Sequence, residues 1–421
     1  MIETRTLCPG VTLRCFRDDR FKQACLSIQM IRPMCREEAA LNALLPAVLL
    51  RGCCKYPDLR SITLGLDDLY GASVSALVRR IGDYQTTGLY CAFIEDRFAL
   101  EGDEILAPMV DFLGQLLLDP VTENGVFFDD FVASEKRNLI STIESELNDK
   151  RAYAAGQLMR IMCREDSFGV PRLGEKESVA AIDPNALYAH YQKILRESPV
   201  EVFYVGSAPA ERIAALLTPL FSRFSGSRNA LPPQTAFHDH GGEHRSEEMD
   251  VAQAKLCMGF TTPITNRSDE FAAMQVLNAL YGAGMTSKLF MNVREKLSLC
   301  YAIGSGYYGS KGILTVSAGI DTDKEGLARQ EILAQLRSCR DGQFTQQELD
   351  AAKEAILSGI RAVHDAPGAI EGYYSTSALS AGKLSLQAYK AAVESCTAEQ
   401  VAAAARSLQL HSSFLLKGVS A

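Results

Sequence analysis

The sequence predicts an α+β fold in which one domain occurs twice. Strand patterns alternate with helix patterns, and two stretches roughly 215 residues apart carry the same order of elements. Short runs rich in β-branched and aromatic residues, flanked by amphipathic helices, are typical of sheets covered by helices. We therefore expect two homologous halves, each an antiparallel sheet with helices packed on one face, related by a pseudo-twofold axis.

Helix pairs are the clearest sign of the repeat. In each half an apolar-periodic helix is followed by a polar loop and a second helix. Residues 133–143 of the first half also resemble residues 351–360 of the second, which supports a duplication. The predicted pairs are 104–118 with 128–147, and 325–336 with 346–363.

Later in each half a capped helix leads to a closing strand. Asp183 is a suitable N-cap for one helix, and Thr397 with Gln400 has capping-box spacing for the other. The halves then close on strands at residues 200–206 and 412–418. Further strands are expected at residues 25–31, 87–93, 254–260 and 312–319.

Residues 222–248 are rich in Gly, Ser, Pro, Arg and His and read as an exposed linker. The predicted organisation is a first domain at residues 1–221, this linker, and a second domain at residues 249–421. Within the linker, His238, His240 and His244 have an H-x-H-x-x-x-H spacing that could bind a transition metal. The flanking glycines and lack of apolar neighbours favour a solvated segment without a supporting shell.

Composition limits the classes of partner and compartment. The chain of 421 residues is 47% hydrophobic and carries a net charge of −8, which gives no reason to expect nucleic acid or an anionic membrane as partner. The 12 cysteines form no regular framework, which favours reduced thiols over a disulfide scaffold. With no apolar signal core and no long apolar run, we expect a cytoplasmic protein.

Residues 43–52 read Ala-Leu-Leu-Pro-Ala-Val-Leu-Leu-Arg-Gly, with a Tyr-Pro pair shortly after. This frame resembles the zinc helix of the insulinase-like metallopeptidases, the family of pitrilysin and the mitochondrial processing peptidase, which carries H-x-x-E-H. Aligned on the glycine, the two histidine positions hold Ala43 and Ala47, and the glutamate position holds Pro46. Alanine offers no lone pair to zinc, and proline cannot act as a general base.

The third zinc ligand of that family lies on a later helix, in a pattern similar to E-K-x-x-x-x-x-E-I. Residues 135–143 resemble this pattern, and the ligand position falls on Thr142. Glu144 and Glu146 could be displaced ligands, but no histidine precedes His190, so a solvated helix face is favoured. We expect no cofactor in this chain and no peptidase activity from it alone.

The second half carries a positive motif at residues 280–301, where a Gly-rich turn precedes Ser-x-Leu-Phe, Arg-Glu-Lys and a tyrosine. Insulinase-like peptidases have a closely similar run. The resemblance implies that Arg294 holds a substrate carbonyl and that Tyr301 donates to the oxyanion at a zinc site on the opposite half or on a partner. Alternatively, Arg294 pairs with a local acid and Tyr301 packs in the core.

The resemblance implies a clamshell of two such units and a catalytically degenerate subunit. It would contribute Arg294 and Tyr301 to a homologous partner that carries H-x-x-E-H and zinc, and act with it on peptides. Among the family it is similar to degenerate members of bacterial two-gene pairs, some of them connected with elongation factor P modification. The alternative is a non-enzymatic scaffold or peptide-binding protein of the same fold. An autonomous peptidase with other ligands has little support.

Overall fold

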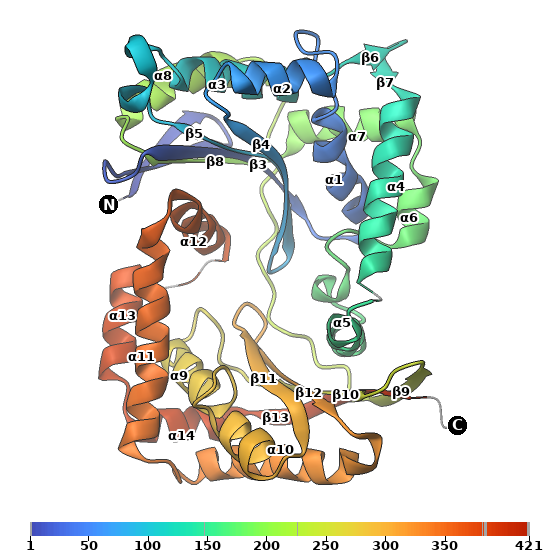
Figure 1. Cartoon of the computed structure of the whole chain (residues 1–421), viewed down its shortest axis with the longest axis vertical. Helices are drawn as coiled ribbons and strands as arrows, with labels where there is room; N and C mark the ends of the chain where they lie inside the picture. Colours follow the sequence, from blue (N-terminus) through green and yellow to red (C-terminus); the bar gives the residue numbers. More distant parts are fainter. Residues whose placement is uncertain (1, 147, 225, 381, 383–384, 419–421) are drawn as a thin grey trace. The chain divides into compact units, whose positions relative to one another are not determined.

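The chain forms two compact units in the computed structural model, which describes residues 2–146, 148–224, 226–380, 382 and 385–418 (Figure 1). Neither unit is continuous in sequence, because the chain passes between them more than once. The first unit comprises Met1–Glu144, Val170–Pro233 and Val363–Leu379, and the second comprises Ser145–Gly169, Gln234–Ala362 and Ser380–Ala421.

A six-stranded sheet is the framework of the first unit, with the strand order β1-β2-β8-β3-β5-β4. All neighbours are antiparallel except β2 and β8, which run parallel. The strands are β1 (Ile2–Cys8), β2 (Val11–Arg17), β3 (Gln23–Pro33), β4 (Ser73–Ile81), β5 (Tyr84–Ile94) and β8 (Val200–Gly206). A separate two-stranded pair joins β6 (Thr122–Glu123) to β7 (Val126–Phe127).

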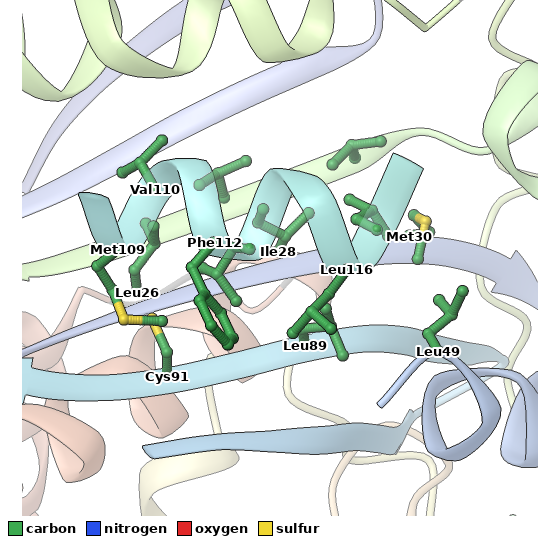
Figure 2. Packing of buried hydrophobic residues seen from close by; sticks show 14 of the residues in the cluster. Leu26, Ile28, Met30, Leu49, Leu89, Cys91, Met109, Val110, Phe112 and Leu116 are labelled. Carbon is green, nitrogen blue, oxygen red and sulfur yellow. The ribbon is translucent and has the colours of Figure 1, made fainter. Parts of the chain in front are cut away.

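Helices cover one face of this sheet and enclose the main core of the unit. Figure 2 shows Met109, Phe112 and Leu116 of α3 packed on Leu26 and Ile28 of β3. Burial of such side chains is the dominant stabilising contribution to the unit. The helices of the unit are α1 (Arg36–Leu49), α2 (Leu59–Asp67), η1 (Asp96–Phe98), η2 (Leu100–Gly102), α3 (Leu106–Leu118), α4 (Asp129–Ser145), α6 (Lys176–Ala181), α7 (Pro184–Glu197), α8 (Ala210–Phe221), η6 (Val363–Asp365) and α12 (Pro367–Ser380).

The second unit is built on a five-stranded sheet of order β11-β12-β10-β13-β9. Its strands are β9 (His244–Met249), β10 (Ala254–Thr261), β11 (Cys300–Tyr308), β12 (Ile313–Ile320) and β13 (Gln409–Gly418). Its helices are α5 (Lys150–Met162), η3 (Ser167–Gly169), α9 (Phe271–Tyr281), the π-helix η4 (Leu289–Lys296), η5 (Thr322–Lys324), α10 (Glu325–Arg340), α11 (Gln346–Ala362), α13 (Leu386–Ser395) and α14 (Ala398–Ser407).

The two sheets share one topology. From β4 to β2 the first sheet runs antiparallel through β5, β3 and β8 and ends on a parallel pair, and the second repeats this sequence from β11 to β9. The predicted α+β class with two homologous halves is therefore confirmed. The Asp183 cap of α7 and the Thr397–Gln400 capping box of α14 are present as expected.

The opposite face of each sheet is covered by a helix that comes from the other half of the sequence. Alternate residues of a strand point to opposite faces. On β3, Leu26 faces α3, whereas Cys25 packs with Ile370 of α12. On β10, Met258 faces the core of its own half, whereas Cys257 packs in the cluster that contains Leu158 of α5. The exchange of helices is reciprocal. The helix α5 follows α4 in the first half of the sequence but belongs to the second unit, and α12 follows α11 in the second half but lies in the first unit.

The observed units differ from the predicted contiguous domains for this reason. The predicted linker also contains part of a strand, because β9 pairs in parallel with β13. Its sequence, His-Arg-Ser-Glu-Glu-Met, is charged and exposed at the sheet edge, so it carries no apolar strand signal. The predicted helix end at residue 147 lies outside the described residues. Across the described part of the chain, no helix is long and apolar enough to cross a membrane.

Candidate functional site

The three zinc-helix positions lie on α1, where apolar packing replaces metal chemistry. Ala43 is only 6% exposed, Pro46 is buried and Ala47 is half-buried. The helix continues through Pro46 to Leu49. Proline has no N–H to give to the carbonyl of Asn42 four residues earlier.

Thr87 of β5 satisfies that carbonyl. Its hydroxyl donates to the Asn42 backbone oxygen at 2.7 Å. The hydroxyl thus replaces the bond that the proline removes, and it fixes α1 to the sheet. A buried carbonyl without a partner would cost about 1–3 kcal/mol, so the hydrogen bond from Thr87 explains why the helix tolerates Pro46.

The Asn42 side chain extends this contact into a buried polar network. Its Oδ1 lies 2.7 Å from His190 Nε2, and its amide donates to Gln85 Oε1 at 2.8 Å. The Gln85 amide donates in turn to the Ala39 carbonyl at 3.1 Å. Burial lowers the pKa of His190 to about 4, so the ring is neutral near pH 7 and donates from Nε2. His190 is therefore a structural hydrogen-bond donor.

The start of α1 is held by charge. Glu38 accepts two bonds from Arg32, each 2.8 Å long, and one from Lys193 at 2.7 Å. Burial opposes ionisation here, but these hydrogen bonds outweigh it and lower the pKa of Glu38 to about 2. The carboxylate in the first turn also matches the helix dipole.

Thr142, the position of the third ligand, lies exposed on α4 and donates to the Asn138 carbonyl at 2.9 Å. The chain just after α1 is linked to the first half of α4, because Arg51 pairs with Glu135 at 3.2 Å. Glu144, one of the two glutamates considered as displaced ligands, forms an ion pair with Lys176. These contacts are those of an ordinary surface helix.

No group of three or more His, Cys, Asp or Glu side chains that could hold a metal occurs within the described residues. The three linker histidines do not converge. His240 Nε2 lies 3.3 Å from the Ile161 carbonyl, and His244 begins β9 with Nδ1 2.8 Å from Ser413 Oγ. His238 is exposed.

Arg294 and Tyr301, by contrast, line one open pocket of about 420 Å³ in the second unit. Tyr301 is 63% exposed, so it does not pack in the core. Arg294 lies over the Phe290 ring at 4.5 Å and its Nε is 3.7 Å from Glu295. Its side chain remains 40% exposed and keeps donors for a ligand.

Local backbone irregularities surround this pair. Arg294 lies on the π-helix η4, and Tyr301 lies at a register shift near the start of the edge strand β11. Between them, Ser298 has a left-handed φ of 51°. π-Helices, bulges and strained residues all cluster at functional sites.

The Gly-rich turn before η4 packs directly on β11. A Cβ at Gly282 would lie 2.6 Å from Ser305 Oγ, and the Gly282 carbonyl accepts from the Ser305 amide at 3.0 Å. Lys324 and Asp321 complete the pocket wall and pair at 2.8 Å. Sequence motifs located Arg294 and Tyr301, but they did not identify Asn42, Thr87 or the strained serine, which no spacing marks.

Comparisons with known proteins identify relatives over the whole chain. A family model described as the peptidase M16 inactive domain matches residues 181–356. A Bacillus subtilis protein named probable inactive metalloprotease YmfF is 28% identical over 409 residues, which cover 97% of this chain and 96% of that protein. The crystal structure of a conserved protein from Enterococcus faecalis V583 has a TM-score of 0.93 and 26% identity, covering 100% of this chain and 99% of that one. A Pseudomonas fluorescens structure described as a peptidase M16 inactive domain has a TM-score of 0.82 and 17% identity, covering 100% and 98%.

Proposed function

Because the chain is a homologue of the M16, or insulinase-like, peptidases of the inactive type, we propose that it is the non-catalytic subunit of a two-chain zinc peptidase. It contributes Arg294 and Tyr301 to the zinc site of a homologous partner that carries H-x-x-E-H, and the heterodimer cleaves peptides. No disulfide joins the cysteines in the described part of the chain, which fits a reducing compartment such as the cytoplasm.

One observation carries the proposal: Arg294 and Tyr301 line a single open pocket, while the positions of the zinc ligands hold Ala43, Ala47 and Thr142. A guanidinium can bind a peptide carbonyl or carboxylate through two donors. A phenol can donate to the oxygen that becomes negative when metal-bound water attacks that carbonyl. These two donors stabilise charge but supply neither the metal nor the base, so a partner has to provide both.

A scaffold or peptide-binding role is the second candidate. The observation in its favour is that Arg294 already has local partners, Phe290 and Glu295. An arginine that serves only to stabilise the surface of η4 would need no more than these contacts.

Reconstitution with the zinc-bearing partner distinguishes the two roles. Tyr301→Phe removes one oxyanion donor and should lower kcat about a hundredfold, or about 3 kcal/mol, with little change in assembly. Arg294→Ala should raise KM and also lower kcat, because it removes a substrate contact.

Matched controls use the same substitutions elsewhere in the unit. Tyr308→Phe alters the other end of β11, and Arg245→Ala alters an exposed arginine of β9. Both should leave turnover unchanged. If Tyr301→Phe and Arg294→Ala behave like these controls while the complex assembles, the scaffold role is the correct one. The isolated chain should remain at the blank rate in peptide-library digestion, and chelator-sensitive cleavage by a pure sample would contradict the proposal.

A further inference from the structure

We propose that Ser298 is a positioning residue whose left-handed backbone closes the helix of Arg294 and turns the chain so that Tyr301 enters the same pocket. This inference rests on the proposed function and adds a determinant of that site. It concerns how the chain between the two functional side chains is shaped.

Backbone hydrogen bonds at the C-terminal end of η4 involve the last turn of the helix, which contains Arg294. The Ser298 amide donates to the Arg294 carbonyl at 3.1 Å, and the Leu299 amide reaches back to the Val293 carbonyl at 3.0 Å. The Leu297 amide donates to the Asn292 carbonyl at 3.1 Å, in the wide spacing of a π-helix. Such a closure requires a left-handed residue, which is usually glycine or asparagine. Here that residue is Ser298, with φ of 51°.

The same turn determines where Tyr301 points. Directly after Ser298 and Leu299, the buried Cys300 opposes Ile320, and Ala302 already opposes Gly319. Tyr301 is therefore the extra residue of a bulge, and bulges redirect a side chain from its regular position in the sheet. Only Leu299 and Cys300 thus separate the strained serine from the tyrosine, and both Ser298 and Tyr301 line the pocket.

The serine conformation is unfavourable by itself. A left-handed backbone brings Cβ close to the following carbonyl, and only glycine adopts it freely. Ser298 is exposed and makes no contribution to the hydrophobic core. Strain at an exposed position persists where the surrounding structure requires it, and such positions cluster at functional sites. The backbone angle, not the hydroxyl, is therefore the property that the site uses.

Substitutions that differ in left-handed preference test this in the reconstituted complex. Ser298→Gly should retain at least about half of kcat, since glycine favours the required angle. Ser298→Val should lower kcat about a hundredfold with KM little changed, because a β-branched residue resists that angle and a misplacement of about 1 Å can cost this much. Ser246→Val is the matched control on the exposed edge strand β9, and it should leave kcat unchanged.

A double-mutant cycle separates positioning from general stability. If Ser298 acts through Tyr301, Ser298→Val in the Tyr301→Phe background should cost less than about threefold further in kcat, whereas independent structural damage would be additive. Far-UV circular dichroism of each variant establishes that it is folded.

Each outcome has a separate meaning. If Tyr301→Phe lowers kcat but Ser298→Val does not, the positioning role is wrong and the proposed function stands. If Ser298→Gly loses as much activity as Ser298→Val, the hydroxyl matters and the backbone argument is wrong. If Tyr301→Phe has no effect, this role of Ser298 is overturned, and if Arg294→Ala also has no effect, the proposed function is overturned as well.

Discussion

Glu371 of α12 is a buried carboxylate with several hydrogen-bond donors, and neutralising it should loosen that helix. The carboxylate is fully buried. It accepts from Ser27 Oγ at 2.7 Å, from Gln29 Nε2 at 2.9 Å, and from both terminal nitrogens of Arg79 at 3.0 and 2.7 Å. Glu371→Gln keeps one acceptor but turns an amide donor toward the guanidinium.

The size of the effect follows from burial. Breaking a buried ion pair by removing one partner typically costs about 3–5 kcal/mol. The Arg79 side chain is 29% exposed, so water can compensate part of its charge. We therefore expect a loss of about 2–4 kcal/mol in the local stability of α12. At about 3 kcal/mol, exchange of the α12 amides through local opening should become about a hundredfold faster.

Hydrogen exchange with mass spectrometry on peptides from α12 measures this change. The control is Glu354→Gln on α11, because that glutamate forms an exposed ion pair with Arg361. Exposed ion pairs contribute little to stability, so hydrogen exchange of the α12 amides should barely change in the Glu354→Gln variant. If the α12 amides exchange as slowly in the Glu371→Gln variant as in the control variant, the buried carboxylate does not hold the helix on the sheet.

Three further outcomes are expected. The first unit should lose about 3 kcal/mol of stability as pH falls from about 6.5 to about 4, because unfolded His190 binds a proton that the buried ring does not; His190→Gln should flatten this slope in urea unfolding followed by circular dichroism. Gly88→Ala should lower the free energy of unfolding in urea by about 3 kcal/mol, since its Cβ would lie 1.9 Å from the Ile28 carbonyl oxygen, whereas Gly306→Ala meets only an ordinary contact and should change this free energy far less. Elemental analysis should find no stoichiometric zinc once the histidines within residues 238–244 are replaced, and a full equivalent would contradict the degenerate site.

The sequence by itself determined the features that depend on neighbouring residues. The strand at residues 200–206 and the caps at Asp183 and Thr397 occur where their local patterns predict them. The duplication is readable because each half repeats the same local patterns. The loss of zinc ligands at Ala43 and Ala47 is also a property of residue identity alone, since alanine cannot ligate a metal in any fold.

Only the tertiary structure decided which distant groups satisfy one another. Pro46 indicates that a carbonyl loses its helical partner, but nothing in the spacing indicates that Thr87 replaces it. The exchange of α5 and α12 is equally hidden, because an amphipathic helix shows that it buries one face but not against which sheet. The left-handed angle at Ser298 is likewise imposed by its surroundings, because serine has no intrinsic preference for it. Local periodicity encodes the elements, whereas long-range packing selects their partners and sets the geometry of the site.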